Sequence, residues 1–465
     1  DETGDGTVLA PFATITHGSE VATAQGVATG QIQAVAVAMG TYEEQVVLQN
    51  GVSIYGQFDE EDMWSRSVAN TTTISWGAVS EGRIEAVIAN EISAPTVLEG
   101  FEVRARTAPG DARSVDVYGV RVTESVPVLP DVGGLILRNL DVASGQAARG
   151  ADGSPGAVGE SGVVGATGNP GGTADGNPIA GGEGSVSICE TVTIESTRGG
   201  TGGVGGGDGA MGCGTFESSA TAGVAPVAVS TCIGGTVGDA CGCLDGGAGG
   251  GEGNLCAPAP ADDGSAAIAA TTRGQVELGV WVASAPANGE PGATGVGGSG
   301  GGGGGSGCNA IGWGPTGGGG GGGGSGGCGG QGGEGGRAGG SSFALFVVES
   351  TIATPGCAFR SGVGGVGGAA AEGGAGGEGG EGGLGGTGGF AGGLGGAGQA
   401  GGAGGPGAGG VGGSSVGALI CESEIDELEL SAVEALAEGA GGSAPAGGAA
   451  GIGGFATPVF FGCNF

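Results

Sequence analysis

Glycine recurring at every third position is the feature that most limits what this chain can fold into. Of the 465 residues, 127 are Gly, and the stretch 150–171 reads GADGSPGAVGESGVVGATGNPG. From Val363 to Phe390 the non-Gly residues fall mainly on another three-residue frame, which breaks at Phe390-Ala391 and resumes from Leu394 to Pro406. Gly loses more backbone entropy on folding than any other residue. If such stretches are ordered, their N–H and C=O groups must therefore find hydrogen-bond partners.

A period of three matches a left-handed extended helix with three residues per turn and a rise of about 3.1 Å per residue. In GGX runs two of the three ridges are bare backbone, so neighbouring helices can approach and bond through their main chains. The third ridge is expected to face solvent or the sheet. A collagen triple helix is the rival interpretation, but the Gly-X-Y phase is short and poor in Pro. We favour a polyglycine-II bundle within one chain, with a reversal tip at 308–316, where Asn, Gly and Pro favour a turn.

The amino-acid composition of the chain changes near Gly145. Residues 1–145 have ordinary composition, with short alternating runs of Val, Ile, Leu and Tyr. Beyond them, Gly-rich stretches alternate with apolar runs at 185–198, 222–233, 265–284, 341–360 and 414–436. Three β-rich runs, at 118–125, 343–350 and 418–423, each end in Glu-Ser. One supersecondary unit repeated at long period predicts a solenoid, and a parallel β-helix suits such short runs.

Residues 38–59 carry the motif Ala-Met-Gly-Thr-Tyr-Glu-Glu followed by Asn-Gly-Val-Ser-Ile-Tyr-Gly-Gln-Phe-Asp. With the flanking motifs from Asp5-Gly6-Thr7 to Gly100-Phe101-Glu102-Val103, this region resembles the start of secreted bacterial right-handed β-helix proteins of the pectin-lyase-like superfamily. The resemblance implies an all-β solenoid fold and no particular activity. The GGX periodicity resembles the springtail antifreeze proteins and the tips of some phage adhesins.

We therefore expect an all-β protein, a right-handed parallel β-helix whose long Gly-rich loops pack as a polyglycine-II helix bundle. Residues 1–145 would form the amino-terminal cap and first coils. Residues 146–465 would alternate coils with Gly-rich arms, each coil extruding one arm on the same side. The bundle is expected to pack against the β-helix.

Charge and composition exclude several classes of protein. There are 47 acidic and 12 basic residues, a net charge of −35, and every basic residue is Arg. Such a chain is repelled by nucleic acids and by anionic membrane surfaces, and no run of eighteen apolar residues predicts a membrane span. The lack of an initial Met and of a signal-peptide pattern is what we expect of a processed, secreted chain. The predicted location is extracellular or at a bacterial cell surface.

The cysteines cluster after residue 185. They are Cys189, Cys213, Cys232, Cys241, Cys243, Cys256, Cys308, Cys328, Cys357, Cys421 and Cys463. Disulfides fit an extracellular chain that has little core in this half, and all eleven are disulfide candidates. Zinc is the rival reading, but Cys241-Gly242-Cys243 has neither a paired CxxC nor a nearby His. The odd count leaves one thiol that is free or joins subunits.

No catalytic residue is predicted. Charged residues gather between Glu102 and Asp116, namely Glu102, Arg104, Arg106, Asp111 and Asp116. Carboxylates and Arg serve polysaccharide lyases and hydrolases, but a solvated charged face explains them better. His17 is the sole histidine, and no motif supports a catalytic triad around it.

No cofactor is expected, and Ca²⁺ is the one metal kept as an alternative. The secreted Ca²⁺-binding nonapeptide needs GGxGxDxUx, and Asp208 in the nearest match is displaced by one position. Asp262-Asp263-Gly264 is too short to count. In the acidic run 422–430 we expect Ile425, Leu428 and Leu430 to point inward and the acids outward.

Four aromatic residues are candidates for assembly contacts: Trp313, Phe460, Phe461 and Phe465. The three Phe cap the solenoid or dock on the next subunit. The first functional hypothesis is a secreted structural protein that acts by rigid shape and self-association, as a filament or surface-layer subunit. The alternative is an adhesin or ice-binding module that takes a surface glycan or ice, although Thr71-Thr72-Thr73 is the only Thr run. A polysaccharide lyase or hydrolase ranks third.

Overall fold

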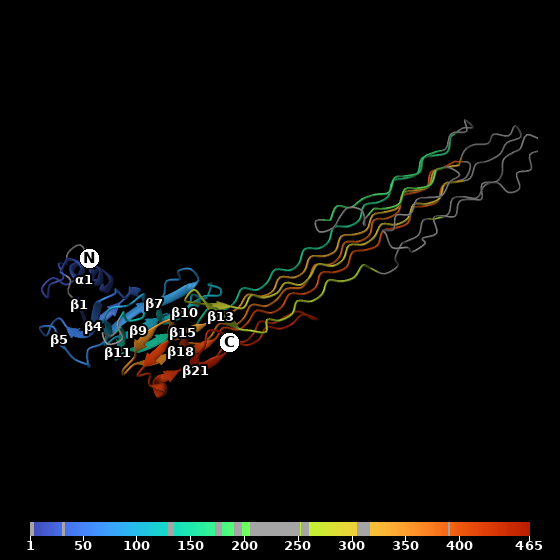
Figure 1. The fold of residues 1–465 in the computed structure, drawn as a ribbon. Coiled ribbons are helices and arrows are strands. Elements are labelled where there is room, and N and C mark those ends of the chain that lie inside the picture. Colours follow the sequence, from blue (N-terminus) through green and yellow to red (C-terminus); the bar gives the residue numbers. More distant parts are fainter. Residues whose placement is uncertain are drawn as a thin grey trace, which may run out of the picture.

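A computed structural model shows a stack of β-coils from which a long bundle of extended segments projects (Figure 1). It describes residues 4–29, 33–128, 134–172, 179–189, 198–204, 252, 260–304, 317–388 and 391–465. The strands of the stack lie in three parallel sheets, here called faces 1, 2 and 3.

Face 1 contains β1 (Gln33–Ala38), β4 (Val52–Asp59), β8 (Thr96–Glu99), β11 (Leu135–Arg138), β16 (Thr351–Ala353) and β19 (Glu424–Asp426), with the short β5 (Ser65–Arg66) antiparallel to β4. Face 2 contains β2 (Gly40–Tyr42), β6 (Thr72–Trp76), β9 (Glu102–Ala105), β12 (Asp141–Ser144), β17 (Ala358–Arg360) and β20 (Val433–Glu434). Face 3 contains β3 (Val46–Val47), β7 (Arg83–Asn90), β10 (Asp116–Thr123), β15 (Ser342–Val348), β18 (Ser415–Cys421) and β21 (Ala456–Phe461). A 3₁₀ turn, η1 (Leu430–Ala432), precedes β20.

Each coil contributes one strand to each face in turn, so the predicted parallel β-helix fold class is confirmed. The three Glu-Ser runs stack on one another in β10, β15 and β18, where Val120 pairs with Leu345 and Leu345 pairs with Ala418. The repeated Glu-Ser run therefore marks equivalent strands of successive coils that stack on one another.

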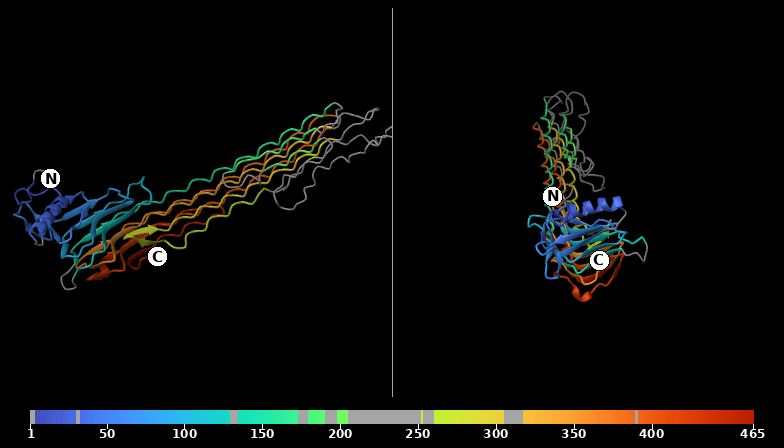
Figure 2. Two further views of the ribbon diagram at one scale, coloured as in Figure 1. Left: turned by 45° about the horizontal axis from the view of Figure 1, so that its top comes forward. Right: turned by 90° about the vertical axis from the view of Figure 1, so that its left-hand side faces the viewer.

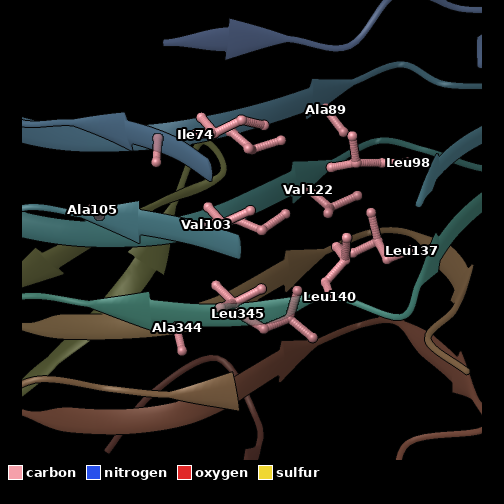
Figure 3. Packing of buried hydrophobic residues seen from close by; sticks show 14 of the residues in the cluster. Ile74, Ala89, Leu98, Val103, Ala105, Val122, Leu137, Leu140, Ala344 and Leu345 are labelled. Atoms are coloured by element: carbon pink, nitrogen blue, oxygen red, sulfur yellow. The ribbon is translucent and has the colours of Figure 1, made fainter. Parts of the chain in front are cut away.

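Alternate side chains fill the lumen between the faces. In β9 the burial alternates residue by residue, and Val103 is fully buried above Ile74. Figure 3 shows Val122 and Leu345 of face 3 in the same cluster of lumen side chains. By contrast every residue of β15 and β18 is buried, because a second apolar cluster covers the outer side of face 3.

One α-helix, α1 (Ile15–Thr29), closes the amino-terminal end and packs on β1. Glu44 caps it, because its carboxylate accepts the N–H groups of Ile15 at 2.8 Å and Thr16 at 2.9 Å. Ile15 is buried in the lumen cluster. The predicted amino-terminal cap is thus helical, a form that the sequence analysis did not specify.

All the Gly-rich insertions leave the stack at the corner between faces 2 and 3. They lie between β12 and β15, between β17 and β18, and between β20 and β21. The expectation that arms emerge on the same side is confirmed. The apolar run 265–284 adds no coil to the stack, because it contains an antiparallel hairpin, β13 (Gly274–Glu277) and β14 (Val280–Ala283). The apolar run 222–233 and residues 190–197 of the run 185–198 lie outside the described residues.

The bundle extends away from the coils, so the expectation that it packs against them is wrong (Figure 2). The reason lies in how strands continue into extended segments. Ser342 of β15 donates its N–H to Ser414 O, and Gly339, one turn earlier, donates to Val411 O with the same offset of 72 residues. The parallel pairing of the strands thus passes directly into parallel pairing of the Gly-rich segments, which keep the strand direction.

Candidate functional site: the rod bundle and its root

The Gly-rich bundle is the part of the molecule that most distinguishes it, and it is built from extended segments that we call rods. The described rods span 145–172, 179–189, 198–204, 260–267, 284–304, 317–341, 361–388 and 391–414. Short segments at 435–443 and 449–455 flank two of them near the coils.

The rod 317–341, here called the central rod, has neighbours on all sides. Its N–H groups donate to three rods, as in Gly327 to Gln399 O, Cys328 to Glu160 O and Gly320 to Gly203 O. Its carbonyls accept from three others, with donors Gly377, Gly295 and Gly182. The six surrounding rods also bond to one another in a closed ring, through Ala166 to Glu183 O, Gly199 to Ser185 O, Gly200 to Gly298 O, Gly396 to Ser299 O, Gly395 to Gly383 O and Gly150 to Val366 O. This is the arrangement of a polyglycine-II bundle within one chain.

The sequence of the central rod follows the number of its neighbours. Where six rods surround it, residues 317–324 are all Gly and all buried. Near the last described residues of one neighbour, Ser325 bonds to Ser187 and Cys328 forms a disulfide with Cys189. Closer to the coils, Glu334 and Arg337 point to solvent. The switch from GGG to GGX at Ser325 therefore coincides with the last described contacts of two neighbours, 179–189 and 198–204, a signal that the sequence analysis missed.

Bare backbone is required at the Gly positions. A Cβ on Gly377 would overlap the carbonyl oxygen of Glu160, and one on Gly330 would overlap that of Gly374. The third ridge of the rod 361–388 faces solvent, as predicted, with Val366 49 % and Leu384 63 % exposed.

Serine pairs and one partly buried carboxylate tie the rods to the coils. Ser144 and Ser342 share a hydrogen bond of 2.8 Å at the root of the first insertion, and Ser361 and Ser415 share one of 3.0 Å at the second. Asp116, at the start of β10, accepts the N–H of Ser341 at 2.6 Å. Burial raises the pKa of Asp116 to about 7, while this hydrogen bond and the charge of Arg83 act in the opposite direction.

The charged residues of the candidate set at 102–116 do not converge. On face 2, Arg104 lies 3.1 Å from Glu102 and 2.7 Å from Asp141. Arg106 pairs with Glu43, and Asp111 is exposed. Asp116 lies on face 3, at the root of the bundle. These residues form cross-coil ion pairs and a root contact rather than one constellation.

His17 lies on α1, with its ring edge-on to Phe12 at 4.6 Å between centroids and Nδ1 3.8 Å from Glu20. Across the described ranges, no group of three or more His, Cys, Asp or Glu is placed to hold a metal ion. Asp208 lies outside the described residues. Asp263 accepts the N–H of Ala403 at 2.8 Å, so it links two rods.

Among the described cysteines, four form two disulfides, Cys189–Cys328 between rods and Cys421–Cys463 at the carboxyl-terminal coil. Cys357 is unpaired, so its candidacy as a disulfide partner was wrong. Its thiol is buried in the lumen and donates to Leu137 O at 3.2 Å, and burial raises its pKa to about 12. The remaining six lie outside the described residues: Cys213, Cys232, Cys241, Cys243, Cys256 and Cys308.

The four aromatic candidates for assembly contacts differ in their surroundings. Phe460 and Phe465 pack within the chain, with 4.5 Å between their ring centroids. Phe461 is 72 % exposed on β21, and Trp313 lies outside the described residues, as does the predicted tip. A role of these residues in assembly stays a prediction.

The acidic run 422–430 behaves mostly as expected. Ile425 and Leu428 pack against the lumen cluster. Leu430 is 64 % exposed, so its inward placement was wrong. It begins η1, which turns its side chain away from the lumen.

The corner after four strands of face 3, β7, β10, β15 and β18, holds a Glu with positive φ. Glu91, Glu124, Glu349 and Glu422 have φ between 48° and 53°. The Ser after three of them builds a ladder, in which Ser125 N donates to Ser350 Oγ and Ser350 N donates to Ser423 Oγ. This ladder explains the Glu-Ser repeat in structural terms.

Comparisons with known proteins add only a distant likeness. No protein-family model matches the chain, and no curated protein matches it. Among solved structures it is similar to the pectin methylesterase from Aspergillus niger in deglycosylated form, at 15 % identity and a TM-score of 0.15. The match covers 30 % of this chain and 55 % of that chain. A penultimately deglycosylated form of the same enzyme gives 14 % identity, the same coverage and the same TM-score.

A likeness at this level transfers no catalytic residue to this chain. The parallel β-helix is carried by the chain's own strand pairing. In the part of the chain that the structure describes, no helix has the length and apolar character needed to cross a membrane.

Proposed function

We propose that this chain is a secreted bacterial structural protein that acts outside the cell by rigid shape and self-association. The coil stack would serve as the base, and the rod bundle as a stiff spacer. The observation that carries this proposal is the central rod, whose main chain is bonded to rods on every side. At about 3.1 Å per residue, the central rod alone is about 75 Å long.

The covalent and surface chemistry support an extracellular place. Two disulfides join described residues, and disulfides persist in oxidising compartments. The net charge of −35 favours solubility in a crowded or saline exterior.

Self-association is proposed to run through the carboxyl-terminal coil. Its strands β19, β20 and β21 are the last in their sheets, and Phe461, Leu430 and Leu436 are 72 %, 64 % and 52 % exposed there. The opposite end is covered by α1. Unpaired edge strands are natural sites for pairing between chains.

Two measurements test this function. Small-angle scattering of the purified chain should give the profile of a base with a straight, stiff rod; a profile of a flexible coil would contradict the spacer.

Light scattering after size exclusion should show oligomers of the wild-type chain. Phe461→Ser should convert these oligomers to monomers. The control Val68→Ser, at a 91 % exposed site on another part of the stack, should leave them intact. A monomer at every concentration would contradict self-association.

The regular rows of exposed side chains on the rods favour a second candidate, an adhesin or ice-binding module. Exposed positions recur every three residues in rod 361–388, as at Glu372, Ala375 and Glu378. The single Thr run does not contribute a surface row, because Thr72 is 1 % exposed. A thermal-hysteresis assay and a glycan array test this candidate, and no signal in both would remove it.

A further inference from the structure

The hairpin β13–β14 interrupts the first insertion and returns it to the coil stack. It lies on the outer side of face 3, where Trp281 is 4 % exposed. The main-chain N–H of Trp281 donates to the hydroxyl of Tyr118 at 3.2 Å. The centroid of the Trp281 ring lies 6.0 Å from that of Phe343. The hairpin therefore covers aromatic side chains that β10 and β15 direct outward.

The last residues of the chain fasten this hairpin. Arg273 donates its N–H to Phe465 O at 2.8 Å, and Val276 donates to Cys463 O at 2.6 Å. The ring of Phe465 stacks on Trp281 with 4.4 Å between centroids. The carboxyl-terminal tail thus pairs with the hairpin through an antiparallel bridge between Gln275 and Asn464 and closes the aromatic cluster at its edge.

A disulfide ties that tail to the coil stack. Cys421 ends β18 and is 3 % exposed, and Cys463 lies two residues from the end of the chain and is partly exposed. The main-chain bond from Gly462 N to Ile420 O, at 2.8 Å, is the neighbouring contact between tail and strand. Residues 462–465 also make five main-chain hydrogen bonds, and the ring of Phe465 contacts three others. Each hydrogen bond is worth about 1 kcal/mol, so the disulfide, at about 3 kcal/mol, is the largest single contribution that fixes these four residues.

We propose that Cys421–Cys463 is a reducible latch: its opening frees the tail from the hairpin and uncovers the aromatic outer side of face 3. The other described disulfide has no such role. Cys189–Cys328 joins rods whose main chains are already bonded, through Ser185 N to Gly323 O. The latch would let a reducing environment convert a closed aromatic surface into an open one.

The chemistry needs a dithiol reductant. A thiolate of the dithiol attacks the sulfur of Cys463, the more exposed of the two residues, and the Cys463–Cys421 bond breaks as a mixed disulfide forms. The thiolate of Cys421 leaves and takes a proton. The second thiol of the reductant then attacks its own sulfur in the mixed disulfide and releases Cys463 as a thiol. The protein gains two electrons and two protons, and the reductant becomes a cyclic disulfide.

The test compares oxidised protein, protein treated with dithiothreitol, and the Cys421→Ser/Cys463→Ser variant without reductant. The matched control is Cys189→Ser/Cys328→Ser, and Trp281→Phe assigns the fluorescence. Reduction and the latch variant should shift the Trp281 emission to the red and speed amide exchange in 274–283 by more than about tenfold. The rod-cysteine control should leave both signals unchanged.

Thiol counting by mass establishes that Cys421 and Cys463 are reduced. If both are reduced while Trp281 emission and exchange in 274–283 stay as in the oxidised protein, the latch is refuted. If the latch variant does not fold, the reductant titration of the wild-type protein decides, because protection of β10 and β15 reports whether the stack itself survives. Loss of that protection together with the hairpin's would also overturn the proposal, because opening would then be global.

Discussion

In the coil stack, packing of buried side chains holds the main chain in place, whereas in the rod bundle hydrogen bonds between main chains do. The lumen is filled by residues such as Leu345 and Val103, both 0 % exposed. In the central rod, residues 317–324 have no side chain at all, yet all are buried. The two regions have nearly the same rise per residue. The coil strands of each face are parallel, whereas four of the six rods around the central rod run antiparallel to it. The comparison shows that an ordered interior needs partners for its atoms, and that these can be amides alone.

The largest expected effect comes from placing a side chain inside the bundle. Gly377→Val would drive its Cβ into the carbonyl of Glu160 and break the bond from Gly377 N to Cys328 O. With several neighbouring bonds lost at about 1 kcal/mol each, and buried groups left unpaired, the rod should lose about 5 kcal/mol. Amide exchange in 317–341 measures the loss.

The control for this prediction is the adjacent residue. Glu378→Val lies on the exposed ridge and should change the stability by no more than about 0.5 kcal/mol. Equal effects at the two positions would contradict the bare-ridge arrangement.

The second effect is a pH dependence of stability that arises at the junction of the coil stack and the rod bundle. Because the pKa of Asp116 is raised to about 7 in the folded protein, against about 3.9 unfolded, the folded state binds its proton more tightly. The favourable contribution is complete below about pH 4 and is lost as the pH rises through about 7, an upper estimate of about 4 kcal/mol. Asp116→Asn keeps an acceptor for Ser341 N–H and should remove this pH dependence.

The measurement is the difference in free energy of unfolding between Asp116→Asn and the wild type, followed from pH 4 to pH 8. The variant should gain stability relative to the wild type as the pH rises. A difference that is flat or of opposite sign would mean that desolvation at the root does not raise the pKa of Asp116.

The third prediction compares one residue type in both regions. Leu345→Ala removes a fully buried side chain from the lumen and should cost about 3 kcal/mol. Leu384→Ala removes one that is 63 % exposed on a rod and should cost less than about 0.5 kcal/mol. Chemical denaturation of both variants measures the contrast, and a large loss for Leu384→Ala would show that rod side chains do contribute to packing.

The smallest effect concerns the corner of face 3. Glu124 has a φ of 49°, a conformation that costs a residue with a Cβ about 1 kcal/mol. Glu124→Gly should therefore stabilise the stack by up to about 1 kcal/mol, and Glu372→Gly, on an exposed rod ridge, should bring no such gain. Thermal unfolding of the two variants tells them apart.

Sequence periodicity allowed the rod bundle and the coil stack to be predicted in different detail. The three-residue frame from Val363 to Phe390 indicated which ridge is bare, because only Gly permits rods to touch through their backbones. The Glu-Ser repeats indicated stacked strands, because residues at equal positions in successive coils meet the same corner. The emergence of the arms on one side followed from the same reasoning.

Other features depend on contacts that no local pattern records. The run 15–29 has no clear apolar stripe, and its helix depends on Glu44 and on the open end of the lumen. The run 265–284 looks like a coil, but its Trp281 finds its partners on face 3 and at the carboxyl terminus. Disulfide pairing likewise joins residues 139 and 42 positions apart.

Hydrogen–deuterium exchange along 317–348 tests the central claim most directly, because this stretch runs from the central rod into β15 without interruption. If main-chain amides bind the rods together, the N–H groups of 317–341 will exchange as slowly as those of the buried strand 342–348. Exchange of 317–341 within seconds, at the rate of an unstructured peptide, with 342–348 still protected, would contradict the account.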